Sequence, residues 1–160
     1  MVIDKEIITQ KIWQILETVC DPEVPVLTVT DLGIIRDVKI TDDEVEVIIT
    51  PTYTGCPAMD MIAMNIKLAL IENGYPNIKI TSVLSPAWTT DWMSEAGKRK
   101  LKEYGIAAPD KRFTIALDGI ECPLCNSTNT KLISEFGSTA CKALYQCNDC
   151  KEPFDYFKCH

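Results

Sequence analysis

Apolar side chains follow two different spacings in the first part of the chain, and these spacings predict helical and extended segments. Residues 4–20 place Ile, Leu and Val on one helical face, which predicts an amphipathic helix. Two closely spaced prolines in residues 21–25 exclude further helix and predict an extended loop. Residues 34–40 and 44–50 then alternate with a period of two, so we predict a β-hairpin there.

The same two patterns continue after the hairpin. An apolar series at helical spacing begins at Pro57 and stops at Gly74, which predicts a second long helix. Residues 78–84 predict a third strand, and residues 92–104 predict a further helix with a basic run. This order of elements predicts an α+β domain built from helices and a three-stranded sheet.

The eight cysteines are distributed unevenly, and their distribution predicts a second domain. Two lie within the first 121 residues, whereas six fall in the last 39. A shift in composition this sharp indicates a domain boundary. We therefore predict an α+β domain over residues 1–108, a linker over residues 109–120, and a zinc-ribbon-like β module over residues 121–160.

Four of the clustered cysteines have the spacing of metal ligands. Cys122 and Cys125 form one C-x₂-C pair, and Cys147 and Cys150 form another after an interval of 21 residues. Each pair presents two thiolates from a tight turn, and two pairs complete a tetrahedral set for zinc. Iron or an iron–sulfur cluster is also compatible with four thiolates. Three spare potential ligands lie in the same tail: Cys141, Cys159 and His160.

Cys56 lies between a predicted strand and a predicted helix, in the sequence Thr54-Gly-Cys-Pro57. Gly55 permits a tight turn, and Pro57 suits the first helical position, so Cys56 is expected at or beside the N-cap. Helix N–H groups and the helix dipole favour a thiolate there, which would act as a nucleophile or a soft-metal ligand. The alternative is a small buried side chain at a turn.

Asp21 and Glu23 in the proline-containing loop also have two interpretations. Acidic residues beside proline commonly cap or turn the backbone. They could instead supply carboxylates to a site near Cys56.

Overall composition excludes several classes of function. Lys and Arg total 16 against 23 Asp and Glu, which gives a formal charge of −7. Such an acidic chain is poorly suited to non-specific binding of nucleic acid or an anionic membrane. The first residues lack the basic and apolar regions of a signal peptide, so we expect a cytoplasmic protein whose cysteines do not form disulfides.

Candidate catalytic residues are scarce. The one histidine is His160, so a Ser/Cys–His–Asp relay would need the last residue of this sequence as its base. No Glu-x-x-His pair of the kind used by di-iron bundles is present. We therefore expect a protein that is not itself an enzyme.

Several short motifs resemble the metal–sulfur cluster assembly domain family. They lie at residues 21–26, 30–33, 54–57 and 86–88. Longer blocks resemble one branch of that family, the D subunits of bacterial phenylacetyl-CoA epoxidase systems. These blocks lie at residues 86–93, 133–145 and 152–159, so the resemblance runs over almost the whole chain.

The resemblance implies a supporting role. In such systems a di-iron subunit carries out the oxygenation, an iron–sulfur/flavin reductase supplies electrons, and the D-type component assists maturation. It implies that Cys56 is the reactive cysteine, within a motif that includes Thr54, and that residues 21–23 form the family's Asp-Pro-Glu loop. The expected cargo is iron or an iron–sulfur cluster, and the expected partners are the oxygenase or reductase component. A second copy of the chain is a further candidate partner, because an exposed thiol ligand with too few local partners favours dimerisation.

Two other functions remain open at this point. The chain could be an integral, non-catalytic component of the oxygenase, with the ribbon serving structure alone. It could also be a thiol redox enzyme that uses Cys56, although the sequence has no nearby resolving cysteine.

Overall fold

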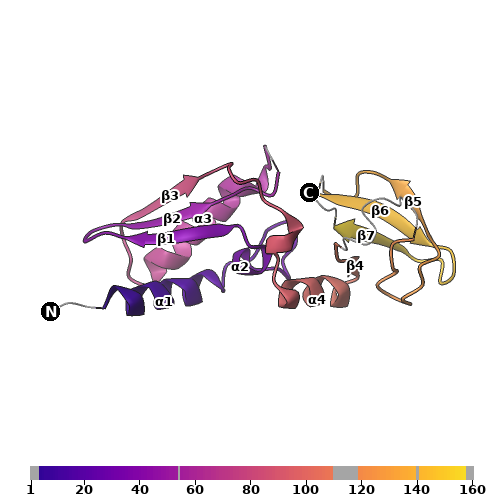
Figure 1. Cartoon of the computed structure of the whole chain (residues 1–160), viewed down its shortest axis with the longest axis horizontal. Helices are drawn as coiled ribbons and strands as arrows, with labels where there is room; N and C mark the ends of the chain where they lie inside the picture. The colour runs from indigo at the N-terminus through magenta and orange to yellow at the C-terminus, as the bar shows by residue number, and fades with distance from the viewer. Residues whose placement is uncertain (1–3, 54, 110–118, 140, 158–160) are drawn as a thin grey trace. The chain divides into compact units, whose positions relative to one another are not determined.

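A computed structural model describes residues 4–53, 55–109, 119–139 and 141–157. Its contacts divide the chain into two compact units, Met1–Ser94 and Glu95–His160. Helices and a three-stranded sheet form the first unit, and a four-stranded sheet with one helix forms the second (Figure 1). The predicted α+β class, with a ribbon-like β module in its C-terminal part, is confirmed.

The first unit packs two helices against one face of its sheet. Its elements are α1 (Lys5–Leu16), α2 (Val29–Leu32), β1 (Ile35–Ile40), β2 (Val45–Ile49), α3 (Ala58–Glu72), β3 (Ile78–Ser82) and the 3₁₀ helix η1 (Thr90–Trp92). Helix α1 contacts α3 and β1, and α3 contacts β3. Alternate residues of β2 are buried, so the helices cover the face to which these residues point.

The order of strands in this sheet is β1-β2-β3, with β1 antiparallel and β3 parallel to β2. Helix α3 makes the crossover that a parallel pair requires. This topology brings the start of β1 and the ends of β2 and β3 to the same end of the sheet (Figure 1). The loops that contain the family-like motifs therefore originate from that end.

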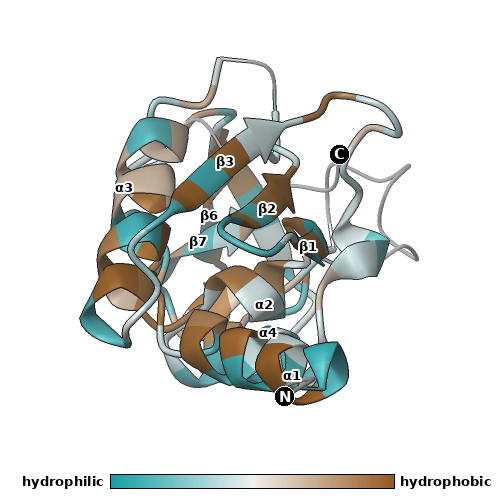
Figure 2. Ribbon diagram, turned by 90° about the vertical axis from the view of Figure 1, so that its left-hand side faces the viewer, coloured by the Kyte–Doolittle hydropathy of each residue, from teal (hydrophilic) through white to brown (hydrophobic). Residues whose placement is uncertain are grey.

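The core of the first unit contains the apolar residues that the periodicity placed on single faces. Fully buried side chains on the helices include Ile12, Leu16, Ile62, Ile66 and Leu70, and those on β2 include Val47 and Ile49. Figure 2 shows the corresponding brown segments on α1, α3 and β2. Burial of these side chains supplies most of the driving force for folding this unit.

Helix α2 is a short element that apolar spacing did not predict. The Thr28 hydroxyl accepts the Asp31 N–H at 3.0 Å, and the Asp31 carboxylate accepts the Thr28 N–H at 3.2 Å. This reciprocal capping box starts a single helical turn. Asp31 also accepts a hydrogen bond from the Ser94 hydroxyl at 2.8 Å, and its carbonyl accepts the Ser94 N–H at 2.9 Å.

These bonds explain why the predicted helix over residues 92–104 is interrupted. Met93 is extended, with φ −67° and ψ 140°, and separates η1 from α4 (Glu95–Glu103). Gly33, at the end of α2, has φ +72°, and a Cβ there would lie 2.2 Å from the Trp92 carbonyl oxygen. Close contact between α2 and η1 therefore requires glycine at this position.

The two tryptophans of this region have different surroundings. Trp88 is 3% exposed, and its indole N–H donates to the Leu32 carbonyl oxygen at 2.8 Å. Trp92 is half-buried, and the guanidinium carbon of Arg36 lies 3.8 Å from its ring centroid. Trp88 is thus a core residue, whereas Trp92 makes a cation–π contact near the surface.

The second unit contains α4 and four strands. These are β4 (Ile106–Ala107), β5 (Thr130–Ser134), β6 (Lys142–Cys147) and β7 (Pro153–Phe157), in the order β4-β7-β6-β5. Strands β5, β6 and β7 are antiparallel neighbours, whereas β4 pairs with β7 in parallel. Tyr145 stacks on Phe154 and meets Tyr156 edge-on, with ring centroids 5.9 and 5.7 Å apart.

The compact units divide the chain earlier than the predicted boundary, because α4 contacts β4 and β4 pairs with β7. The predicted bounds of 1–108, 109–120 and 121–160 stay a prediction, since most of the linker lies outside the described residues.

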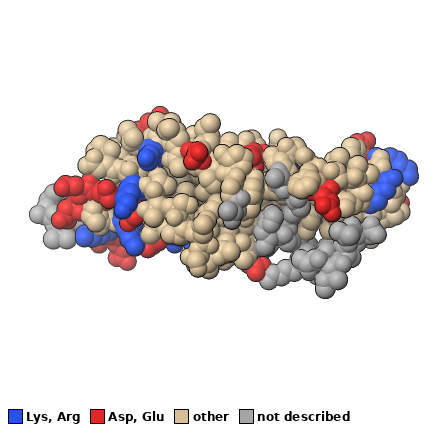
Figure 3. All heavy atoms as spheres, turned by 90° about the horizontal axis from the view of Figure 1, so that it is seen from above, with Lys and Arg blue, Asp and Glu red and all other residues tan. Residues whose placement is uncertain are grey.

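Among the described residues, no helix combines the length and the apolar character needed to cross a membrane. Figure 3 shows acidic and basic side chains in small groups on one face, most of which is neither acidic nor basic.

Candidate functional site

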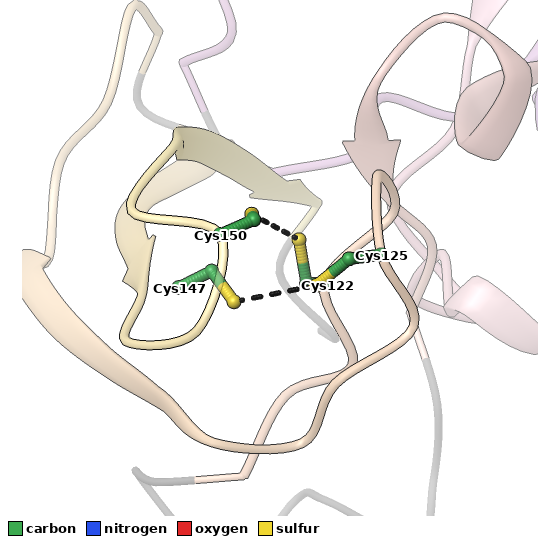
Figure 4. A group of neighbouring side chains, drawn as sticks. All are labelled: Cys122, Cys125, Cys147 and Cys150. Atoms are coloured by element: carbon green, nitrogen blue, oxygen red, sulfur yellow. Dashed lines mark hydrogen bonds between the residues drawn. The ribbon is translucent and has the colours of Figure 1, made fainter.

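Two tight turns present the four cysteines of the C-x₂-C pairs to one another (Figure 4). In the first turn the Cys122 carbonyl accepts the Asn126 N–H at 2.8 Å, and the Cys122 N–H donates to the Ser127 carbonyl at 2.8 Å. The residue after each pair, Asn126 or Lys151, has a positive φ of 63° or 69°. Both turns thus reverse the chain immediately after the second cysteine of the pair.

The separations of the four sulfur atoms fit a tetrahedral ion. Cys122 Sγ lies 3.8 Å from Cys150 Sγ, and Cys125 Sγ lies 3.5 Å from Cys147 Sγ. All four sulfurs lie within 4.8 Å of one another. Thiolates bound at about 2.3 Å from a tetrahedral zinc lie about 3.8 Å apart, so this cluster matches the size of a four-thiolate site.

The thiols of this cluster differ in acidity. Backbone N–H groups, first that of Cys150 and then that of Asp149, donate to the Cys147 sulfur and lower its pKa to about 7. The Glu152 N–H favours the Cys150 thiolate, but partial burial and the three neighbouring thiols outweigh it and raise its pKa to about 12. Of these two thiols, Cys147 therefore ionises at the lower pH.

Polar side chains beside the cysteines join the two turns. The Ser127 hydroxyl donates to the Asp149 carboxylate, and the Asn129 amide donates to the same carboxylate at 3.1 Å. The Asn148 amide donates to the Asn129 side-chain oxygen at 3.0 Å. The hydrogen bonds from Ser127 and Asn129 lower the pKa of Asp149, so this bridging carboxylate is charged at neutral pH.

We expect Asp149→Ala to weaken zinc binding about tenfold, because groups that orient metal ligands typically contribute 10–100-fold to affinity. The substitution removes the acceptor that holds Ser127 and Asn129 of the first turn against the second turn. Competition with a chromophoric chelator measures the change. Glu152→Ala removes one negative charge beside the same turn and should change the affinity by less than about twofold. Equal losses in the two variants would contradict a specific role for Asp149.

Cys56 lies in the loop between β2 and α3. Helix α3 begins at Ala58 with Pro57 as its N-cap, so Cys56 immediately precedes the N-cap. The Cys56 N–H donates to the Tyr53 carbonyl at 3.3 Å, its carbonyl accepts the Met59 N–H at 3.3 Å, and its side chain is half-buried. The prediction that Pro57 is the first helical residue is wrong by one position, because Pro57 occupies the N-cap position. The prediction that Cys56 lies at or beside the N-cap is confirmed.

Asp21 has a structural role in its loop. Its carboxylate is largely buried and accepts the backbone N–H groups of Glu23 at 2.6 Å and Val24 at 3.0 Å. These two bonds fix the turn between the prolines, as an acidic residue in such a loop commonly does. The loop precedes α2 and β1, so it belongs to the same end of the sheet as the Cys56 loop (Figure 1).

The structure brings together some predicted site residues and not others. Among the described residues, the four ribbon cysteines form the single group of three or more Cys, His, Asp or Glu side chains close enough to share an ion. Cys56, Asp21 and Glu23 form no such group, and their functional roles stay predictions. Cys141 is buried, with the Thr139 hydroxyl 2.9 Å from its sulfur. Thr54, Cys159 and His160 lie outside the described residues.

Two features were missed by sequence reasoning. The first is the set of hydrogen bonds between Ser, Asn and Asp side chains that joins the two metal-binding turns. The position of these polar residues beside the cysteines was the sequence signal that could have indicated it. The second is Thr50, at the end of β2. Its hydroxyl is fully buried and has no hydrogen-bond partner in the described part of the chain. No sequence pattern distinguishes this threonine from others in strands.

The fold and the cysteine cluster define a class of protein: an α+β domain joined to a four-cysteine ribbon. Residues 9–83 match the model of the iron–sulfur cluster assembly protein family, and residues 108–158 match the PaaD zinc beta ribbon domain. The crystal structure of a DUF59 domain from Bacillus anthracis is 29% identical. The structural match between the two covers 60% of this chain and 92% of the Bacillus anthracis chain, with a TM-score of 0.56.

The chain belongs to the family of phenylacetyl-CoA epoxidase D subunits. It is 48% identical over 151 residues to an Escherichia coli protein provisionally named as the D subunit of 1,2-phenylacetyl-CoA epoxidase. That alignment covers 93% of this chain and 92% of the relative. A shorter relative from Porphyromonas gingivalis, named Fe-S protein maturation auxiliary factor, is 37% identical over 94 residues, covering 58% of this chain and 89% of its own. The family resemblance read from the motifs is confirmed.

Proposed function

We propose that the protein is an accessory factor that assists maturation of a phenylacetyl-CoA epoxidase and is not itself an enzyme. The observation that carries this proposal is a half-buried thiol immediately before the N-cap of α3, in a chain that also holds a separate four-cysteine centre. The names of the relatives, an epoxidase component and an auxiliary factor for Fe-S protein maturation, support both parts of it.

In this proposal Cys56 transiently binds iron or an iron–sulfur cluster as cargo. Soft thiolate ligands suit both iron and iron–sulfur clusters. Pro57, the N-cap residue of α3, makes no side-chain hydrogen bond to the start of the helix, and the Met59 N–H donates to the Cys56 carbonyl at 3.3 Å. Asp21 orders a neighbouring loop, and Glu23 and Thr54 are the remaining candidates for contact with the cargo.

The four-cysteine centre serves a different purpose in the proposal. Four protein thiolates close the coordination sphere of a tetrahedral ion and leave no position for a substrate, as in structural zinc sites. We therefore assign zinc to this centre and a docking role to the ribbon that it stabilises. The client is the oxygenase or reductase component of the epoxidase, and the setting is the cytoplasm.

The proposal is tested by measuring zinc, iron and acid-labile sulfide in protein purified without oxygen. Wild type should contain about one zinc per chain together with iron or sulfide. Cys56→Ser should keep the zinc and lose the iron and the sulfide. Cys20→Ser is the matched control, because Cys20 is an exposed cysteine in the same unit. Unchanged cluster occupancy of the client in cells that carry Cys56→Ser would overturn the transfer role.

A second candidate is a structural component of the oxygenase, which the name of the Escherichia coli relative as an epoxidase D subunit favours. In that case the protein would co-purify with the active oxygenase in a fixed ratio. Cys56→Ser would then leave both the ratio and the cluster content of the complex unchanged.

A further inference from the structure

Helix α3 is apolar on two opposite sides, and only one of them faces the core. Ala58, Ile62, Ile66 and Leu70 are buried against the rest of the first unit. On the opposite side, four large apolar side chains are 49–55% exposed; these are Met61, Met64, Leu68 and Ile71, here called the α3 stripe.

The stripe is continuous rather than scattered. Its residues are spaced by three, four and three positions, which places them within about 80° of one another around the helix, at about 100° per residue. Four half-exposed side chains of this size expose on the order of 400 Å² together, in the range of about 300–600 Å² typical of the largest, often functional, patch on a monomer.

A groove borders the stripe at Leu68. It has a volume of about 350 Å³ and lies between the segment that follows α1 and the middle of α3. The first wall contains Thr18, Val19 and Cys20, and the second contains Asn65 and Glu72 beside Leu68. The stripe therefore continues into a hollow whose walls are mainly polar, which would receive the polar edge of an amphipathic helix whose apolar face lies on the stripe.

Charge distinguishes between the possible occupants. Residues 1–94 contain 14 acidic and 6 basic residues, for a net charge of −8, whereas residues 95–160 have a net charge of +1. Asp60 and Glu72 lie near the two ends of the stripe and Lys67 lies beside it, so the charged residues of α3, two acidic and one basic, have a net charge of −1. A second copy of the chain would bring another strongly acidic unit to this surface, and a basic partner would be attracted to it.

We propose that the α3 stripe and its groove bind an amphipathic helix of a partner protein whose apolar face is bordered by basic residues. Methionine side chains adapt to partners of different shape, which suits a surface that is not fully complementary to one sequence. This surface belongs to the first unit and is separate from the ribbon, and the inference does not depend on whether Cys56 carries a metal.

The test uses two designed amphipathic peptides with the same leucine face, one with lysine and one with glutamate on the polar face. Binding of fluorescent peptide to the full-length protein is measured by anisotropy at low and moderate salt. Leu68→Glu places a charge in the stripe, and Leu84→Glu makes the same change at a leucine of the same unit that is 61% exposed and outside the stripe. Zinc content and thermal unfolding verify that both variants fold.

We expect the lysine peptide to bind wild type and Leu84→Glu equally, and Leu68→Glu at least about tenfold more weakly, the loss of a moderate hot spot. The glutamate peptide should bind more weakly than the lysine peptide, and added salt should reduce the difference between their affinities. Equal binding by the two leucine variants would overturn the proposal. So would dimerisation that Leu68→Glu abolishes in sedimentation velocity, or co-sedimentation with phosphatidylcholine vesicles that depends on Leu68.

Discussion

Replacing Cys147 by serine is expected to abolish metal binding and to unfold the ribbon of the second unit. Cys147 ends β6, is fully buried and supplies one of four converging sulfurs, and a serine hydroxyl is a poor substitute for a thiolate. Structural zinc sites contribute about 10–16 kcal/mol of apparent binding free energy, and in small ribbons this is folding free energy. Zinc content should fall from about one per chain to nearly none, and the near-ultraviolet circular dichroism of Tyr145 and Tyr156 should be lost.

Cys141→Ser is the control for this experiment. Cys141 is also buried in the second unit, but its neighbour is Thr139 and it is not in the group of four sulfurs. We expect this variant to retain its zinc. The first unit should remain folded in both variants, since its core residues all precede Glu95. If Cys147→Ser kept a full equivalent of tightly bound zinc, a different ligand set would be indicated.

Trp88→Ala is expected to destabilise the first unit by about 4 kcal/mol, in the range for removing a large aromatic side chain from a core. Trp88 is 3% exposed, so its removal leaves a cavity. It also leaves the Leu32 carbonyl, at the end of α2, without the indole N–H that donates to it at 2.8 Å. Urea unfolding of the full-length protein, followed by circular dichroism, measures the loss.

Trp92→Ala gives the matched comparison. This ring is half-buried and contacts the Arg36 guanidinium, so its removal should cost only about 1–2 kcal/mol. Trp88→Phe should fall between the two alanine variants, because it keeps most of the ring and loses the N–H donor. Similar losses for the two alanine variants would show that Trp88 does not anchor α2.

The spacing of apolar residues along the chain was sufficient to predict the long helix and the hairpin of the first unit. The hairpin predicted over residues 34–40 and 44–50 corresponds to β1 and β2, and the helix predicted from Pro57 to Gly74 corresponds to α3. The four metal-ligand candidates were recognisable because each pair is held by a turn of its own. Spacing along the chain fixes such features before any long-range contact forms.

Features that depend on contacts between distant segments were not predictable. The break between η1 and α4 results from bonds between Ser94 and Asp31, which are far apart in the sequence. The exposed side of α3 was also missed, because helical spacing alone does not show how much of the helix surface the rest of the fold covers. Likewise, the sequence alone does not determine whether Asp21 faces Cys56 or, as observed, its own loop.

The short strand β4 has a consequence for dissecting the protein into fragments. It pairs in parallel with β7, although most of the ribbon's sequence lies between them. A fragment that starts at the first metal-binding cysteine would lack Ile106 and Ala107 and leave β7 with an open backbone edge. Unprotected edges recruit strands from other molecules, so such a fragment would be prone to aggregate. An isolated ribbon should therefore start at Glu95, where the second compact unit begins.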